Sequence, residues 1–413
     1  MQNSNSDLLY SPPVRGKIGT LHKGSFLFVD IFLLIGGALV PQIVINKMRS
    51  YASTKLAKIL LQDQGVTNRQ ITFTDSGTSA LALALRMGGL QEGEEVYFSA
   101  NTCESVARAV IGCGGAPVFL GVTAGGSTDL SNFTEHVNRA NGRAIILTNT
   151  YGLPEDIDVA NRIAGPLKLA VINDLAQVTI FSKAFAQVCQ KSSISVVSFG
   201  PEKYLSCLGG GAVIYSKEFS PPSITGSQTL RAVLNIFIER VKYYLTFAVF
   251  GTILYPMLRL LRMTFDLRSE KDIDMVEVGD ITEPAIPNGV VLFGVLVRAL
   301  ILRRRAKKEK HLYSLLCRQV NQRFFVVQPS KDYIPPTLLI RARSGSRFLL
   351  AQRLARKKFQ TTWNYIPLYM IRPFRKYRTT GTSDLWRVVL QVPFRFLSEG
   401  KIKGLAAAIN DAV

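Results

Sequence analysis

Short apolar runs alternate with amphipathic segments from about residue 67 onward. Residues 79–87 and 105–113 have the spacing of amphipathic helices, whereas the runs around them are short and rich in β-branched residues. These runs lie at residues 70–74, 95–99, 116–120, 144–148, 169–173, 195–198 and 212–215. Strands separated by helices favour βαβ units, so we predict an α/β fold with a mainly parallel central sheet covered on both faces.

The pattern changes after residue 218. Residues 219–290 contain an apolar segment and then a polar, acidic loop at Asp266–Asp280. A long helix is predicted over Val291–Val320, followed by a small α+β domain with a late strand at Trp386–Gln391 and a final helix at Ser398–Ala412. The predicted divisions are an N-terminal segment 1–66, a large domain 67–218, an insertion 219–290, and a linking helix with the small domain 291–413.

Two apolar stretches raise the question of a membrane. Phe26–Asn46 is interrupted only by Asp30, and Tyr243–Leu258 lies between Lys242 and Arg259. Each has a charge-free run shorter than the ~18–20 residues that a spanning helix needs. A buried core helix, an insertion into one leaflet and full spanning are the alternatives. Tyr243–Leu258 is the stronger membrane candidate, because basic residues and tyrosines flank it.

The net charge of +21 belongs almost entirely to one half of the chain. Residues 1–228 hold 18 Lys and Arg against 16 Asp and Glu, and residues 229–413 hold 32 against 13, so the halves carry +2 and +19. Such clusters attract nucleic acid, anionic lipid or phosphorylated substrates. No nucleic-acid-binding motif accompanies them. The five cysteines are scattered, which suits a reducing compartment and gives neither a disulfide framework nor a metal site.

Three further features together suggest chemistry. Asp75–Ser79 joins a predicted strand to a helix start, where backbone N–H groups can hold a phosphate. Asp174 follows a buried strand, with Gln177 close behind it. Lys203 lies five residues after Ser198 and shortly before a glycine run. Taken singly, each has an ordinary explanation: a helix cap, a capping aspartate and a surface lysine in a turn.

The order of these blocks is more specific than any one of them. The segments concerned are SGTSALALAL, VYFSANTCESVARAVIGCGGAPVFLGV, TNTYGLPEDID, VINDLAQ, SFGPEKYLSCLGGGA and VVLQVPFRFLSEGKIKGLAAAIND. Over about 67–218 and again over 290–413, the chain resembles the DegT/DnrJ/EryC1/StrS aminotransferases. The resemblance implies a fold-type I enzyme that uses pyridoxal 5'-phosphate, usually a homodimer, and moves an amino group from glutamate to a nucleotide-linked keto-sugar.

The resemblance also implies roles for particular residues. Lys203 would form the Schiff base with the cofactor and act as the general acid and base. Asp174 would pair with the pyridine nitrogen, and Gln177 would lie by the phenolic oxygen. Ser198 would hold the phosphate together with the helix start, and Gly210–Gly211 would allow close approach of the backbone. The helix-start residues concerned are Gly77, Thr78 and Ser79.

Several positions depart from the family pattern. Cys103 stands where an aromatic residue usually stacks on the cofactor ring, and Ser99 replaces a proline. Asn173 and Gly121 each replace an acidic residue, and Asn288 is a poor match to the segment that reaches the neighbouring subunit. One interpretation is an aminotransferase of cell-surface polysaccharide or glycolipid synthesis, cytoplasmic and peripheral on the inner face of the membrane. The alternative is a catalytically altered, membrane-associated binding or scaffold protein.

Overall fold

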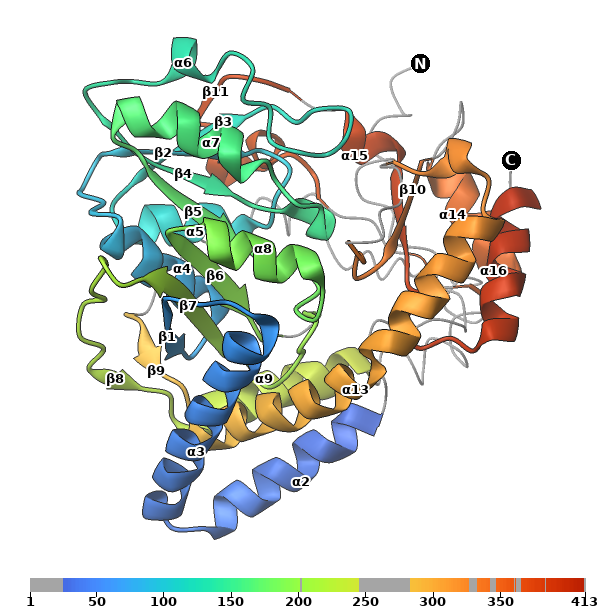
Figure 1. Ribbon diagram of the computed structural model, residues 1–413, viewed down its shortest axis with the longest axis horizontal. Coiled ribbons are helices and arrows are strands. Elements are labelled where there is room, and N and C mark those ends of the chain that lie inside the picture. The colour runs from blue at the N-terminus through green and yellow to red at the C-terminus, as the bar shows by residue number, and fades with distance from the viewer. Residues whose placement is uncertain are drawn as a thin grey trace.

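The computed structural model describes residues 25–200, 203–244, 283–326, 333–341, 347–359, 361, 365–382 and 384–411. An eight-stranded sheet forms the centre of its larger part (Figure 1). In spatial order the strands are β1 (Arg69–Thr74), β7 (Gly211–Ser216), β6 (Ile194–Ser198), β5 (Ala170–Asp174), β4 (Gly142–Leu147), β2 (Glu95–Ser99), β3 (Ala116–Leu120) and β11 (Arg378–Thr379). β7 is antiparallel to both neighbours, and the other pairings are parallel. The predicted α/β fold with a mainly parallel sheet is therefore confirmed.

Helices cover both faces of this sheet. α4 (Gly77–Met87) and α5 (Glu104–Gly112) pack on one face, and α7 (Ile157–Ala164) and α8 (Lys183–Lys191) on the other. Side chains of a strand alternate between the two cores, as the pleat requires. On β2, Val96 and Phe98 join the core with α4 and α5, whereas Tyr97 joins the core with α7 and α8.

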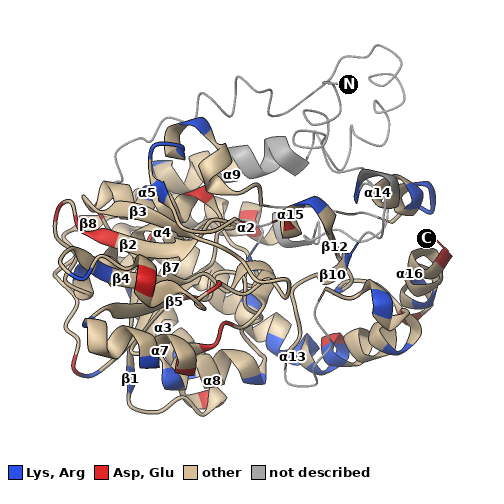
Figure 2. Ribbon diagram, turned by 90° about the horizontal axis from the view of Figure 1, so that it is seen from above, with Lys and Arg blue, Asp and Glu red and all other residues tan. Residues whose placement is uncertain are grey.

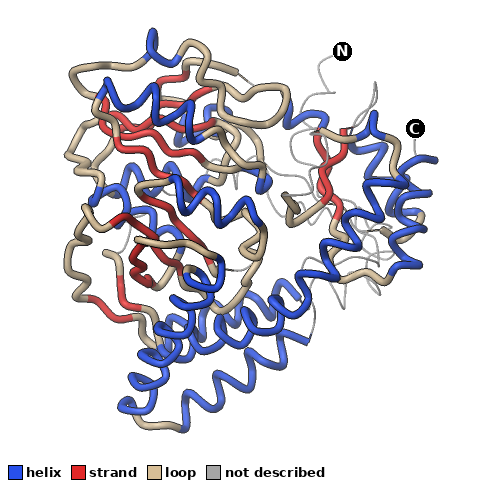
Figure 3. The backbone as a smooth tube through the Cα atoms, viewed as in Figure 1, coloured by secondary structure: helices blue, strands red, loops and turns tan. Residues whose placement is uncertain are grey.

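The C-terminal region has its own core around a two-stranded antiparallel sheet (Figure 3). Its strands are β10 (Leu338–Arg341) and β12 (Val389–Val392), and its helices α14 (Arg347–Arg356) and α16 (Glu399–Asp411). The predicted final helix is present, but the predicted strand Trp386–Gln391 is wrong at its start. Leu385–Val388 forms a helical turn, α15, because the turn buries Trp386 against the Arg347 guanidinium.

The apolar stretch Phe26–Asn46 is divided between two helices. Pro41 ends α2 (Ser25–Leu39) and stands in extended conformation before α3 (Gln42–Leu60). Both pack on the long helix α13 (Gly289–Gln319), and α2 also contacts α9 (Leu230–Tyr244). None of the described helices is both long and apolar enough to cross a membrane. Residues 245–258 of the second apolar stretch and the acidic loop 266–280 lie outside the described residues.

Helix α13 contributes to two cores. Its first half packs with the large sheet, and its second half packs with the C-terminal sheet. The predicted domain divisions stay predictions. The remaining short elements are α6 (Phe133–His136), β8 (Gly226–Ser227), β9 (Ala285–Ile286) and 3-10 turns at Gln62–Gln64, Thr150–Gly152, Gly165–Leu167, Gln322–Phe324, Leu368–Met370 and Arg372–Phe374.

Candidate active site

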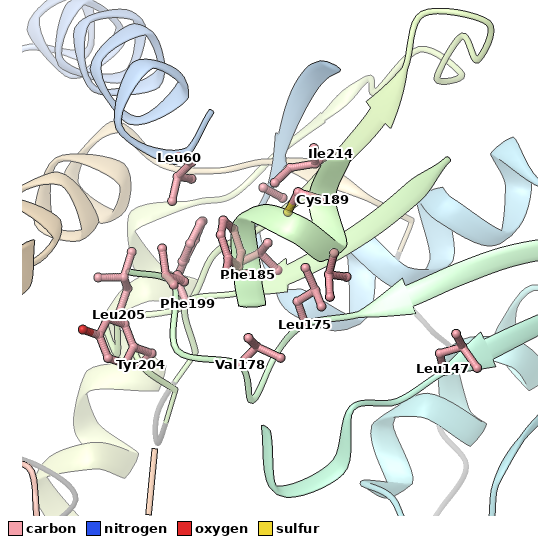
Figure 4. Packing of buried hydrophobic residues seen from close by; sticks show 14 of the residues in the cluster. Leu60, Leu147, Leu175, Val178, Phe185, Cys189, Phe199, Tyr204, Leu205 and Ile214 are labelled. Carbon is pink, nitrogen blue, oxygen red and sulfur yellow. The ribbon is translucent and has the colours of Figure 1, made fainter. Parts of the chain in front are cut away.

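Lys203 lies in the loop that joins β6 to β7. Backbone hydrogen bonds close this loop, from Phe199 N–H to the Gly210 carbonyl (2.9 Å) and from Cys207 N–H to the Phe199 carbonyl (2.8 Å). The lysine itself is half-buried, but Tyr204 and Leu205, which follow it, are buried. Figure 4 shows these two side chains with Phe199 in the hydrophobic core. The backbone at Lys203 is thus held in place by hydrogen bonds and by buried neighbouring side chains.

Asp174 is the last residue of β5 and is buried. Its carboxylate accepts a hydrogen bond from Ala176 N–H (2.9 Å). Burial raises the pKa of Asp174, and the positive charge of nearby Lys203 acts in the opposite direction. The structure therefore brings the Asp174 carboxylate and the Lys203 amine into one electrostatic environment, although they are 29 residues apart in the sequence.

The start of α4 faces Ser198. A Cβ added at Gly77 would lie 2.5 Å from the Ser198 hydroxyl oxygen, so only glycine permits this approach. Ser76 caps the helix by accepting a hydrogen bond from Ser79 N–H (3.0 Å). The first N–H groups of a helix have no partner within it, and the helix dipole favours an anion there. Gly77, Thr78 and Ser198 thus make a cradle that fits a phosphate ester.

Ser79 makes its hydrogen bonds within the helix start. Its N–H and its hydroxyl both bond to the Ser76 hydroxyl, the latter at 2.8 Å, and its side chain is buried. The glycines after Lys203 bring this helix start and the loop together. Gly210 has a left-handed φ of 95°, and its N–H donates to the Asp75 carbonyl (2.7 Å).

The Gln177 amide makes two hydrogen bonds within the chain. Its oxygen accepts from Tyr151 N–H (2.8 Å), and its nitrogen donates to the Tyr365 hydroxyl (2.5 Å). The expected place of Gln177 by the cofactor ring thus competes with these two partners. Tyr365 comes from the C-terminal region, so this amide joins the large sheet to that region.

Cys103 is at the start of α5, in the loop after β2, and is half-buried. Two residues before it, Asn101 is 1% exposed. The Asn101 amide lies beside the Tyr151 hydroxyl but meets hydrogen-bond geometry with no described residue. Buried amides are usually hydrogen-bonded, and the Tyr151 hydroxyl is the polar neighbour of this one.

The turn after β4 was not singled out from the sequence as part of the site. Asn149 and Tyr151 both have left-handed backbones, with φ of 40° and 61°. The Asn149 amide donates to the carbonyls of Leu147 (3.0 Å) and Asp174 (3.1 Å), which fixes the ends of β4 and β5 together. Burial raises the pKa of Tyr151 to about 12. An Asn-x-Tyr-Gly turn after a buried strand was the signal available for it.

Two departures from the family pattern have structural explanations. Gly121 follows β3 where the C-terminal chain crosses it, and a Cβ there would lie 3.3 Å from Gly381 Cα. Thr380 N–H donates to the Phe119 carbonyl (2.9 Å) in the same crossing. Asn173 precedes Asp174 on β5 and therefore points to the opposite face of the sheet.

Comparison with known proteins agrees with this arrangement. A sequence model of the DegT/DnrJ/EryC1/StrS aminotransferase family matches residues 63–220. UDP-2-acetamido-2-deoxy-3-oxo-D-glucuronate aminotransferase of Pseudomonas aeruginosa is 29% identical over 143 residues, 35% of this chain and 40% of that protein. dTDP-3-amino-3,4,6-trideoxy-alpha-D-glucose transaminase of Streptomyces venezuelae is 32% identical over 141 residues, 34% and 37% of the two chains. The chain thus spans about two fifths of the length of these relatives.

Solved structures resemble the whole fold. NtdA from Bacillus subtilis, solved with the bound cofactor PMP, superposes on this chain with a TM-score of 0.64 at 18% sequence identity. The superposition covers 94% of this chain and 83% of the NtdA chain. The chain therefore shares the overall fold of NtdA, and the family match over residues 63–220 indicates pyridoxal phosphate as the cofactor. Residues 63–220, which supply Gly77, Asp174, Ser198 and Lys203, match the sequence model of the DegT/DnrJ/EryC1/StrS aminotransferase family.

Proposed function

We propose that this protein is a pyridoxal-phosphate-dependent aminotransferase that passes an amino group from glutamate to a nucleotide-linked keto-sugar. The observation that carries the proposal is the close approach of Gly77 at the start of α4 to Ser198. Ser198 begins the loop that carries Lys203, whose charge acts on the buried Asp174 carboxylate. A lysine, a carboxylate and an anion site are the three groups that this cofactor needs from a protein. The names of the relatives, which describe transaminases of nucleotide-linked sugars, support the substrate class.

Each residue would have a separate task. Lys203 would hold the cofactor through its amine and would move the substrate α-proton. The Asp174 carboxylate would lie by the pyridine nitrogen and favour its protonated form. Ser198 and the N–H groups of Gly77 and Thr78 would hold the phosphate. When bound, pyridoxal phosphate serves as the electron sink and carries the amino group between the two substrates.

The proposal extends to the setting of the enzyme. Glutamate as donor and a homodimer follow from the family resemblance, and the +19 charge of residues 229–413 suits a substrate that carries a diphosphate. We further propose that the enzyme works in cell-surface polysaccharide or glycolipid synthesis. It would act on the cytoplasmic side of a membrane, where its substrate would be made.

The test compares Lys203→Ala with Lys217→Ala, an exposed lysine just past β7. Wild type and Lys217→Ala should show the visible absorption of lysine-bound cofactor, bleached by borohydride, and should form 2-oxoglutarate from glutamate. Lys203→Ala should lose both signals. Absence of the band in wild type saturated with pyridoxal phosphate would refute the proposal. A band without any amino transfer to keto-sugar nucleotides would instead favour the altered binding protein.

A further inference from the structure

Exposed apolar side chains gather on four neighbouring helices. Among the described residues, the ten large hydrophobic side chains that are exposed all belong to α2, α3, α9 and α13. They are Phe32, Ile35, Leu39, Ile43, Val44, Tyr51, Leu234, Ile238, Leu300 and Ile301. Phe32 and Leu39 are 83% and 79% exposed. Single exposed apolar residues are ordinary, but a set confined to one group of packed helices marks an interaction surface.

Loose placement of α2 does not explain why its apolar side chains are exposed. Its opposite side is packed, with Asp30 fully buried in an ion pair with Arg298 of α13. A Cβ added at Gly37 of α2 would lie 2.5 Å from a methyl carbon of Val290, so the two helices touch closely. Helix α2 therefore has one anchored face and one open apolar face, with Phe32, Ile35 and Leu39 on the open one.

The exposed charges on the same helices have one sign. Up to residue 310, the exposed charged residues described on these helices are basic: Lys47, Lys55, Lys58, Arg231, Arg303, Arg304, Lys307, Lys308 and Lys310. The two described acidic side chains, Asp30 and Glu309, are buried against arginines. On α13 the exposed Leu300, Arg304 and Lys307 follow helical spacing, so apolar and basic groups share one face. Figure 2 shows the basic positions along α13 in blue.

We propose that this surface, defined by the ten apolar and nine basic side chains above, docks the enzyme on an anionic lipid bilayer. Large apolar side chains would enter the boundary between headgroups and acyl chains, and the basic groups would meet lipid phosphates. The helices would lie in the interface rather than cross it. A symmetric contact between two copies fits less well, because it would place the same basic patch on both sides. The inference goes beyond the proposed reaction and does not depend on it.

The test is vesicle flotation of the full chain, with vesicles of phosphatidylcholine alone or mixed with phosphatidylglycerol. Wild type should float with the anionic vesicles. Phe32→Ser with Ile35→Ser and Leu39→Ser should weaken binding roughly tenfold or more, because the apolar insertion is lost. Arg304→Gln with Lys307→Gln and Lys308→Gln should weaken it about tenfold on anionic vesicles and little on neutral ones.

A matched control removes three exposed basic residues that lie outside α2, α3, α9 and α13, with Arg139→Gln, Arg162→Gln and Lys168→Gln. It should float like wild type. Equal loss in the control, or no flotation of wild type, would overturn the proposal. So would a serine variant that floats normally but changes from dimer to monomer by light scattering, since the surface would then join two copies. The visible cofactor band, recorded on every preparation, reports separately on the proposed function and on folding.

Discussion

At the scale of single residues, Gly77 has the sharpest requirement of the candidate site. Alanine is ordinarily better than glycine in a helix by about 1 kcal/mol. Here its Cβ would lie 2.5 Å from Ser198 Oγ and 2.6 Å from Ser198 Cβ, so β6 and the start of α4 would have to separate. We expect Gly77→Ala to weaken pyridoxal phosphate binding roughly tenfold or more, as measured by titration of the visible band, since ~1.4 kcal/mol of lost contact is enough.

Gly400, near the start of α16, offers the matched control, because nothing lies within 4 Å of a Cβ added there. Gly400→Ala should leave cofactor binding unchanged and raise stability by a few tenths of a kcal/mol up to about 1 kcal/mol. Equal cofactor affinity in both variants would show that the cradle at Gly77 is not used.

Glu155 gives a prediction about pH. Its carboxylate is 7% exposed and accepts hydrogen bonds from Thr128 N–H (3.0 Å) and the Thr128 hydroxyl (2.8 Å). Burial is the main cause that raises its pKa to about 7, and neighbouring Asp156 adds to the effect. A carboxyl with a pKa raised in the folded state binds more protons folded than unfolded. Its contribution to stability is therefore present at low pH and lost as the pH rises toward and through 7.

Glu155→Gln should abolish this loss. Between pH 5 and pH 8, the free energy of unfolding of the variant should rise by about 2–3 kcal/mol relative to wild type. Urea denaturation of both proteins at the two pH values measures the difference, and groups common to both cancel. Parallel pH dependences in the two proteins would contradict the assignment.

At the scale of elements, a buried charged cluster ties α13 to the Lys203 loop. Arg395 donates to both oxygens of Glu309, at 3.1 Å each, and its guanidinium lies 3.8 Å from the centre of the Tyr204 ring. Tyr204 also donates to Glu309 (3.1 Å). Tyr204 directly follows Lys203, so this cluster positions the loop against α13.

Removal of one charge should be much worse than removal of both. Arg395→Met would leave Glu309 buried without its guanidinium, which typically costs about 3–5 kcal/mol. Arg395→Met combined with Glu309→Met should recover most of that stability, since an apolar pair avoids the desolvation of an unpaired charge. Urea midpoints of the three proteins decide the matter. A single variant within about 1 kcal/mol of wild type would contradict the role of the cluster.

The secondary-structure elements also show which parts of the fold could be predicted from the sequence. Buried strands such as β2 and β3 were predictable, because their runs of β-branched and aromatic residues have a length typical of strands. The turn at Trp386 was not, since its helical geometry depends on Arg347, 39 residues away. In the candidate site, the proximity of Lys203 and Asp174 could be predicted from the order of the sequence blocks that contain them. The bond from Gln177 to Tyr365 depends on tertiary packing across 188 residues, which no local pattern encodes.

At the scale of the whole molecule, α13 is the element that relates the two cores. Val291, Leu292 and Val295 belong to the core of the large sheet, and Leu312 and Leu316 to the C-terminal core. The helix is 31 residues long, which corresponds to about 46 Å at 1.5 Å per residue. The direction of its axis thus sets where the C-terminal sheet, with Leu339 and Val389, stands relative to Tyr151.

Ala306, between these two halves, is the place to test this. Ala306→Pro would remove one helical hydrogen bond and bend the axis, at a cost of about 3 kcal/mol or more. The bend would pull Leu339 and Val389 of the C-terminal sheet away from Tyr151. Transamination should therefore fall at least tenfold while the large sheet stays folded and keeps the cofactor band. Ala306→Gly, which costs about 1 kcal/mol without a bend, should retain activity. Because both substitutions weaken the helix but only proline redirects it, equal activities would show that the axis of α13 does not position the site.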